Sequence, residues 1–320
     1  MKKLYNFYRR NIKNSFVGKL IHKNVIAFYL TYKKNLSDKA YAYHRFNMQF
    51  PYKLNLDNPR SLNEKIQWLK LHDRTPLHTI CADKYAVRNY VKEKLGNEDI
   101  LIPLLFHTSD YRDLKAENLP DQPFILKTNH TSGHNVIVKD KSLLDWELIR
   151  DNYCKWLKEN IYKSRKEWQY KNIPPKVVAE KLMLDHNNKL PFDYKFHCFH
   201  GEVKYIQVDI GRGSETHYRN WYDANWKRAP FKWTAVFKGK ETDPATFDLE
   251  KPKQFEQMLD IAKRLSEDFV YVRVDLYYIK GKIYFGEITF HQDSGNRPIE
   301  PAKYDFELGD LVDLTLIKNK

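Results

Sequence analysis

The spacing of apolar residues along the chain changes near residue 121, and this change predicts its organisation. Before that point the pattern is helical, and Ser61 and Glu64 form the hydroxyl–carboxylate signature of a helix start. A second helix is predicted over residues 83–95, because a glycine such as Gly96 commonly ends a helix. We therefore expect the segment that precedes residue 121 to be mainly helical.

After residue 121 the chain carries short runs of β-favouring residues. Strands are predicted over residues 124–127, 136–138, 176–180, 194–198, 203–208, 270–278 and 283–290. Residues 142–170 and 255–265 have helical patterns, and residues 211–240 are predicted to form a long loop. Neighbouring strands are expected to pair as antiparallel hairpins, without the regular strand–helix alternation of a doubly wound parallel sheet. The predicted fold class is α+β.

Positive charge is concentrated at the N-terminus. Residues 1–60 contain thirteen of the 55 Lys and Arg residues but only two of the 41 acidic residues. Lys19 and Lys23 interrupt the apolar run there, so neither a transmembrane helix nor a signal peptide is expected. We predict a basic, mostly helical segment that packs on the rest of the protein, or that contacts an anionic membrane or a polyanionic substrate. No recognition motif accompanies the charge, so no nucleic-acid partner is expected.

The composition indicates a folded protein of a reducing compartment. The 22 Tyr, 18 Phe and seven Trp residues exclude a largely disordered chain. The three cysteines are odd in number and lack a Cys-x-x-Cys spacing, which argues against a disulfide framework and a zinc ribbon. We therefore expect a cytoplasmic location.

The last predicted hairpin has one apolar and one polar face. Arg273 and Asp275 share the polar face of its first strand, and Glu287 and Thr289 share that of its second. A two-residue loop would place Asp275 and Glu287 on opposite faces, whereas a three-residue loop with Gly281 in the left-handed conformation would oppose them. We predict the three-residue loop.

Opposed carboxylates repel one another unless a cation lies between them. Hard oxygen ligands in this arrangement suit Mg²⁺, which binds few carboxylates and keeps phosphate oxygens and water. Asp275, Glu287 and Thr289 are thus a candidate metal site. The alternative is a solvated strand face on which Arg273 neutralises the two acids.

Two further clusters are candidate nucleotide contacts. Lys127 ends a strand and precedes a small polar loop with Ser132 and Gly133, a suitable cradle for phosphates or an ordinary hairpin loop. A strand that ends in a glutamate and an apolar pair can form a hinge that pairs with adenine, with ribose and phosphate contacts further along. The candidates in this second cluster are Glu180, Lys181, Leu182, Met183, Asp193 and Lys195.

The sequence evidence for a sugar-transferring enzyme is weaker than the evidence for a nucleotide and metal site. Glu159 and Glu167 have the seven-residue gap seen in some of them, but a solvated face of a Lys-rich helix explains this pair better. No Asp-x-Asp occurs in the sequence, which argues against the commonest metal-dependent glycosyltransferase site. The predicted loop 211–240 is suited either to an acidic sugar or to a structural flap. Its residues of interest are Arg212, Arg219, Trp221, Trp226 and Arg228.

Taken in order, these clusters resemble the ATP-grasp superfamily, and the last hairpin is similar to the end of D-alanine–D-alanine ligases. A closer resemblance, from about residue 55 to 310, is to the TupA-like ATP-grasp family of surface-polysaccharide and teichuronopeptide gene clusters. It is carried by Leu62-Asn-Glu-Lys-Ile-Gln-Trp-Leu-Lys-Leu, Asp83-Lys-Tyr-Ala-Val-Arg88, Leu126-Lys-Thr-Asn-His, Asp193-Tyr-Lys-Phe, Arg273-Val-Asp-Leu-Tyr and Tyr284-Phe-Gly-Glu-Ile-Thr-Phe.

The resemblance implies two lobes whose antiparallel sheets clamp ATP and Mg²⁺. By analogy, Lys127 and Lys195 bind phosphates, and Arg273 steadies the transferred phosphoryl group. Adenine is held by Glu180 and the backbone to Met183. The implied organisation is a basic segment (1–60), a helical start of the catalytic domain (61–121), a first lobe (122–183) and a second lobe with the metal-site hairpin (184–320).

The implied activity is that of an ATP-dependent carboxylate–amine ligase. Its expected partners are a polysaccharide or sugar-acid precursor and an amine co-substrate. Thr289 departs from the family pattern, since many ATP-grasp enzymes have Asn there, and residues 291–295 are less rich in glycine than the family's tail. A glycosyltransferase of capsule or O-antigen biosynthesis and a membrane-associated non-enzymatic scaffold remain the alternatives.

Overall fold

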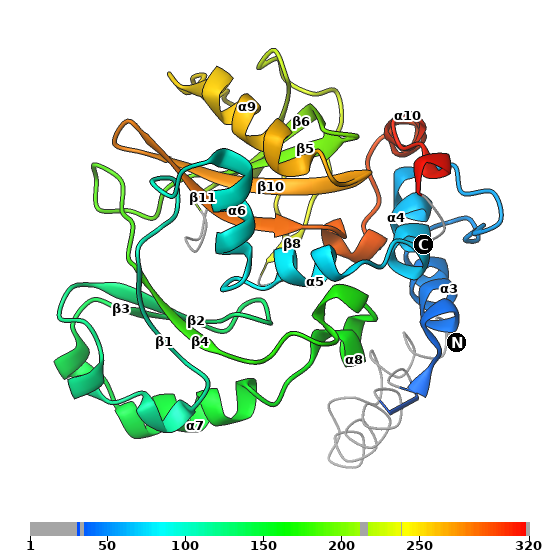
Figure 1. Ribbon diagram of the computed structural model, residues 1–320. Helices are drawn as coiled ribbons and strands as arrows, with labels where there is room; N and C mark the ends of the chain where they lie inside the picture. The colour runs from blue at the N-terminus through cyan, green and yellow to red at the C-terminus, as the bar shows by residue number, and fades with distance from the viewer. Residues whose placement is uncertain (1–30, 33–34, 212–216, 238, 318–320) are drawn as a thin grey trace, which may run out of the picture.

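The computed structural model describes residues 31–32, 35–211, 217–237 and 239–317. Figure 1 shows two sheets in separate layers, one accompanied by α7 and the other by α9. Residues 1–30 and 33–34, about half of the predicted basic segment (1–60), lie outside the described residues. The described helices are α3 (Asp38–Gln49), α4 (Leu62–His72), α5 (Pro76–Ala82), α6 (Val87–Leu95), α7 (Trp146–Trp156), α8 (Ile161–Arg165), α9 (Phe255–Ser266) and α10 (Lys303–Asp310).

The predicted start of α4 is confirmed in detail. The Ser61 hydroxyl accepts a hydrogen bond from the Glu64 amide, and the Glu64 carboxylate accepts one from the Ser61 amide. This reciprocal arrangement satisfies backbone donors that a helix start otherwise leaves free. Helix α3 has a similar hydroxyl cap at Ser37, so residues 38–49 of the basic segment are helical, whereas residues 50–60 form no helix.

Two predicted helices differ from the structure. Helix α6 begins at Val87 rather than at Asp83, because the Asp83 carboxylate accepts the amide hydrogen of Tyr85 and closes a turn. The helical pattern over residues 142–170 is broken into α7, α8 and short 3-10 turns. Asn160 and Lys166 interrupt it, the first with extended and the second with left-handed backbone angles.

The strands form two main antiparallel sheets. One sheet has the order β1-β4-β2-β3, and the second-lobe sheet has the order β11-β10-β5-β6-β7. We call the former the first-lobe sheet; its strand β1 lies within residues 61–121, which were expected to be helical, so the first lobe begins earlier than the predicted residue 122. The strands are β1 (Leu104–Thr108), β2 (Phe124–Thr128), β3 (Asn135–Val138), β4 (Val177–Lys181), β5 (Asp193–Phe199), β6 (Glu202–Ile210), β7 (Tyr218–Asp223), β8 (Val236–Phe237), β9 (Lys240–Glu241), β10 (Tyr271–Ile279) and β11 (Lys282–Thr289). The predicted α+β class is therefore confirmed.

The predicted long loop over residues 211–240 is wrong, because β7 lies within it. Trp221 is buried against Trp233 in the core, and Trp226 stacks on Tyr222. Arg228 forms an ion pair with Asp248. These side chains pack the protein instead of lining an open sugar site; Arg212 lies outside the described residues.

Each sheet packs one face on a core and carries candidate site residues on the other, although a further core around Trp221 and Tyr271 covers part of that other face in the second-lobe sheet. Phe124 and Leu126 of β2 pack with α7 in one core, so Lys127 lies on the opposite face of the first-lobe sheet. Phe196 and Val274 pack with α9 in another core, so the odd-numbered residues of β5 and β10 line the other face of the second-lobe sheet. Helix α6 joins that second core.

Among the described residues, no helix combines the length and apolar character needed to cross a bilayer.

Candidate active site

The opposition of Asp275 and Glu287 predicted for the last hairpin is present. Asp275 pairs with Glu287, and Arg273 pairs with Thr289, across β10 and β11. The predicted three-residue loop is nevertheless wrong. Lys280 and Gly281 form a two-residue turn with positive φ angles of 52° and 83°, the geometry of a tight hairpin.

A β-bulge reconciles the two-residue turn with the opposed carboxylates. From the turn to Leu276, pairing follows the two-residue register, and it shifts between Leu276 and Asp275. The extra residue is Gly286. A Cβ atom there would lie 3.1 Å from both the carbonyl oxygen of Asp275 and the ring of Tyr277. Glycine thus permits the bulge that brings the two carboxylates onto the same face.

Arg273 lies between these carboxylates. Its Nε and Nη2 donate to the two oxygens of Asp275 at 2.6 and 2.7 Å, and Nη2 also donates to Glu287 at 3.2 Å. Its third nitrogen donates to the side-chain oxygen of Gln292. Burial disfavours the charged guanidinium, but Asp275 and Glu287 outweigh this and raise the pKa of Arg273. The residue is a permanent cation at this position.

Lys195 is the second cation of this surface. Its ammonium group contacts Asp193 directly and lies 3.2 Å from Asp275 and 3.6 Å from Asp209. Burial opposes its charge, and the three aspartates together raise its pKa. Asp193 is only 2% exposed, and its carboxylate is a buried partner of the Lys195 ammonium group.

Lys127 and Glu180 face this surface from the first lobe. Their side chains form an ion pair of 2.7 Å, and Arg88 lies 3.5 Å from the other oxygen of Glu180. Beyond Glu180, the amides of Lys181 and Leu182 donate to the carbonyl oxygens of two prolines, Pro103 and Pro123.

The segment after Glu180 retains the donor that an adenine contact requires. Within the described residues, the amide of Met183 has no hydrogen-bond partner. A free amide at the end of a strand can pair with the edge of a purine. The structure therefore fits the predicted hinge at Met183.

The predicted phosphate loop has an anchored base and an open tip. The Asn129 side chain donates to Asp83 at 2.8 Å and accepts from the amide of Lys176 at 2.7 Å, which fixes the base. Ser132 and Gly133 form the exposed tip, and nothing lies within 4 Å of where a Gly133 side chain would begin. The tip is thus accessible to a ligand.

Lys84 is a member of the site that the sequence analysis missed. Its ammonium group donates to the carbonyl oxygen of Thr131 in the phosphate loop at 2.7 Å and lies 4.0 Å from Glu287. It therefore bridges the two lobes. Burial lowers its pKa, while Glu287 acts in the opposite direction. Lys84 lies in the Asp83-Lys-Tyr-Ala-Val-Arg88 motif, which could have indicated its role. It was missed because a continuous helix was predicted there instead of a turn.

Glu167 was misinterpreted from the sequence. It is buried, and its carboxylate accepts a hydrogen bond from the Ser294 hydroxyl, so it is not part of a solvated face. Burial raises its pKa, with Lys70 opposing this effect. Glu159 is half exposed, as the solvated-face interpretation predicted. Glu167 thus secures the turn that follows β11.

Two antiparallel sheets that present lysines, a glutamate hinge and opposed carboxylates to one another define an ATP-grasp protein. The family described as TupA-like ATPgrasp matches residues 64–313. The chain therefore belongs to the TupA-like ATP-grasp family, which confirms the fold and the enzyme class expected from the motifs. No curated protein matches the chain.

The solved structures that resemble this chain include ligases with low sequence identity to it. D-alanine–D-alanine ligase from Bacillus anthracis, complexed with ATP, is 19% identical with a TM-score of 0.35, over 66% of this chain and 55% of that chain. L-amino acid ligase from Bacillus licheniformis is 14% identical with a TM-score of 0.39, over 81% and 55%. D-alanine–D-alanine ligase from Helicobacter pylori is 17% identical with a TM-score of 0.37, over 77% and 66%. The match thus spans little more than half the length of the first two.

The residues of the hairpin fit Mg²⁺ bound together with a nucleotide. In the described part of the chain, no group of three or more His, Cys, Asp or Glu side chains forms a complete metal cage. Mg²⁺ does not require one, because it commonly uses one or two carboxylates and takes its other ligands from phosphates and water. Glu287 is 41% exposed and offers accessible oxygen ligands on the edge strand β11. Asp275 lies opposite it but is only 3% exposed, and both its oxygens accept hydrogen bonds from Arg273, so the guanidinium neutralises this acid in the structure, as in the alternative interpretation, and Asp275 would have to exchange one of these contacts to ligate a metal.

Proposed function

We propose that the protein is an ATP-dependent carboxylate–amine ligase that joins an amine, such as an amino acid, to a sugar acid of a bacterial surface polysaccharide. The observation that supports this most directly is the opposition of Asp275 and Glu287 beneath Arg273. The lysines of the facing lobe add the positive charge that a triphosphate requires.

The proposed reaction has two steps with balanced bonds. An oxygen of the substrate carboxylate attacks the γ-phosphorus of ATP, the bond from that phosphorus to the bridging oxygen breaks, and ADP leaves. The amine nitrogen then attacks the acyl carbon, inorganic phosphate leaves, and the nitrogen loses a proton. Mg²⁺, when bound, neutralises charge on the phosphates.

The protein's own residues hold and orient the reactants. Asp275 and Glu287 would ligate the metal, with Thr289 beside Glu287 at 3.5 Å. Arg273 would neutralise charge on the transferred phosphoryl group, and Lys195 would fix Asp275 in place. Positioning and charge neutralisation are the main contributions to such phosphoryl transfers.

Phosphate contacts would also come from the first lobe. Lys127 and the loop tip at Ser132 and Gly133 lie on its inner side, and Lys84 reaches the same loop. The Lys127–Glu180 ion pair would have to loosen for Lys127 to reach a phosphate, which ATP binding would favour by supplying a stronger anion.

Mass spectrometry of the reaction products tests this function. The protein is incubated with Mg-ATP, a mixture of amino acids and a set of uronic-acid sugars, and the proposal predicts an amide product formed with ADP and phosphate. Sugar transfer from a nucleotide sugar without ATP would instead identify a glycosyltransferase. Absence of any product together with absence of ATP binding would favour a scaffold.

We further propose that the basic segment, residues 1–60, brings the enzyme to the inner face of the cytoplasmic membrane. Its excess of Lys and Arg is the supporting observation. Co-sedimentation with phosphatidylglycerol vesicles but not with phosphatidylcholine vesicles is expected, and the binding should weaken with added salt. Equal sedimentation with both lipids would contradict this proposal.

A further inference from the structure

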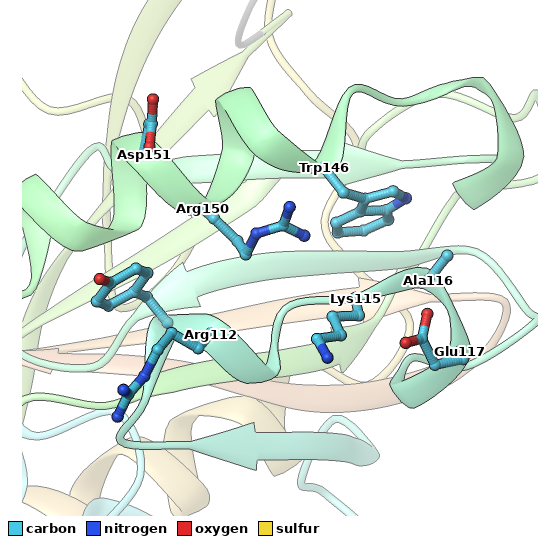
Figure 2. Close-up of a pocket in the computed structure, with 8 residues that line it drawn as sticks. Arg112, Lys115, Ala116, Glu117, Trp146, Arg150 and Asp151 are labelled. Atoms are coloured by element: carbon cyan, nitrogen blue, oxygen red, sulfur yellow. The ribbon is translucent and has the colours of Figure 1, made fainter.

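A cavity of about 580 Å³ lies on the first lobe, away from the candidate active site. It is formed by α7 and by two 3-10 turns, η1 (Tyr111–Asp113) and η2 (Ala116–Asn118). Figure 2 shows Arg150 of α7 extending toward Trp146, with Lys115 and Glu117 on the other wall. We call this the first-lobe cavity.

The first-lobe cavity is separate from the proposed ATP site. Helix α7 packs through Ile149 and Tyr153 on one face of the first-lobe sheet, together with Phe124 and Leu126. Lys127 lies on the other face of that sheet. A ligand in the cavity would therefore be divided from the nucleotide by the sheet itself.

Two cations of the cavity form no ion pair with a described residue, although the carboxylates of Glu117 and Asp151 also line it. In the described chain, neither Lys115 nor Arg150 has a carboxylate within 4 Å, and the one hydrogen bond of the Arg150 side chain goes to the carbonyl oxygen of Leu114 at 3.4 Å. The neighbouring Arg112 differs, because two of its nitrogens donate to the Asp110 carboxylate. Positive charge is thus available at Lys115 and Arg150 for an anionic ligand.

Trp146 provides a fixed aromatic wall. Its indole nitrogen donates to the carbonyl oxygen of Lys141 at 2.9 Å, and its ring packs against the first-lobe core. The polar edge of the ring is therefore already used, and its face is what remains for a ligand. An aromatic face of this kind packs against the carbon–hydrogen face of a sugar ring.

We propose that the first-lobe cavity binds a uronate unit of an acidic saccharide, outside the catalytic site. Lys115 and Arg150 bind the sugar carboxylate, Trp146 packs against the ring, and Glu117 accepts hydrogen bonds from hydroxyl groups. Glu117 would repel a phosphate dianion, which favours a sugar with a single negative charge. The choice of saccharide rests on the proposed function, whereas the cavity and its charges do not.

Isothermal titration of the full chain with trigalacturonate, without ATP or Mg²⁺, tests this proposal. Binding is expected for trigalacturonate, and neither neutral maltotriose nor inorganic phosphate should bind comparably. Arg150→Met and Lys115→Met should each weaken binding by about tenfold, the usual effect of losing one charge-assisted contact. Lys115 is exposed, and its side chain has no hydrogen-bond or ion-pair partner among the described residues, so its variant should fold even if the Arg150 variant does not.

The matched control is Lys155→Met, an exposed lysine on α7 that does not line the cavity. It should bind as the wild type does. Three results would overturn the proposal. The Lys115→Met variant could bind trigalacturonate as tightly as the wild type does, maltotriose or phosphate could bind as tightly as trigalacturonate does, or trigalacturonate could fail to bind. Because no nucleotide is present, these outcomes are independent of any response to Mg-ATP. A protein that responds to Mg-ATP but not to trigalacturonate would retain the ligase function and lose this site.

Discussion

Asp275 lies directly opposite Glu287 because Gly286 inserts one extra residue into β11. Without that residue, the strand pairing set by the two-residue turn at Lys280 and Gly281 would continue unchanged to the end of the hairpin. Glu287 would then fall on the other face of the sheet, since side chains alternate along a strand. The metal site thus depends on a bulge three residues before the end of β11 as much as on its two acids.

Replacing Gly286 by valine should destroy this arrangement. The added carbons would meet the carbonyl oxygen of Asp275 and the Tyr277 ring, so we expect a loss of about 1–3 kcal/mol in the free energy of unfolding. The response to Mg-ATP should be lost as well. Chemical denaturation and thermal shift measure the two effects. Gly281→Asn is the control, because it has open space and asparagine tolerates a left-handed backbone; equal behaviour of the two variants would contradict the role of the bulge.

Replacing Lys84 by methionine should weaken nucleotide binding without unfolding the protein. The change removes the ammonium group that joins the phosphate loop to Glu287, so we expect the dissociation constant for Mg-ATP to rise by about tenfold. Lys84→Arg should retain part of the affinity. Titration calorimetry with a non-hydrolysable ATP analogue provides the measurement, and unchanged affinity in the methionine variant would remove Lys84 from the site.

Replacing Ser294 by alanine should destabilise the turn that follows β11. The hydroxyl is a hydrogen-bond donor to the buried Glu167, and its loss would leave a buried carboxylate short of a partner, at a cost of about 1–3 kcal/mol. Glu159→Gln, at a half-exposed position, should change the free energy of unfolding by less than about 0.5 kcal/mol. Denaturant titrations of both variants check this, and an equally small effect at Ser294 would mean that Glu167 is not buried in solution.

The pH dependence of stability should reveal the buried amine of Lys70. Burial lowers its pKa from 10.5 to about 8, against the opposing influence of Glu167. Between these values the unfolded chain holds the proton and the folded chain does not. The contribution of Lys70 to stability should therefore rise with pH through this window, by at most about 1.4 kcal/mol per pH unit, and be lost as pH falls through about 8.

The comparison for this prediction is Lys70→Met. The difference in unfolding free energy between the wild type and the variant, measured by denaturation from about pH 7.5 to 10, should increase in favour of the wild type. Parallel curves would show that Lys70 keeps an ordinary pKa in the folded protein.

The sequence was sufficient for features that depend on local patterns. The cap at Ser61 and the polar face shared by Arg273 and Asp275 follow from the spacing of a few neighbouring residues, and the structure has both. The family resemblance extended these local features to the ATP-grasp fold, because its motifs occur in a fixed order.

What the sequence did not reveal depends on contacts between distant segments. Asn129 donates to Asp83 at the turn before α6, and Ser294 donates to the buried Glu167; both contacts join residues far apart in the chain. Trp221 was placed in a loop because its burial depends on Trp233. The pairing of Glu287 with Asp275 was predicted correctly, but from an incorrect loop length. A glycine within a strand is not sufficient to predict a bulge, so the bulge at Gly286 was not foreseen.

Thermal unfolding of the Glu287→Gln variant with and without Mg-ATP is the most direct test of the account. Wild-type protein at about 100 times the dissociation constant of Mg-ATP should gain about 2.7 kcal/mol of stability and a higher melting temperature. Glu307→Gln, at an exposed position on α10, should respond as the wild type does. Glu287→Gln should show no rise in melting temperature, and a rise equal to that of the wild type would contradict the assignment of Asp275 and Glu287 as the metal site.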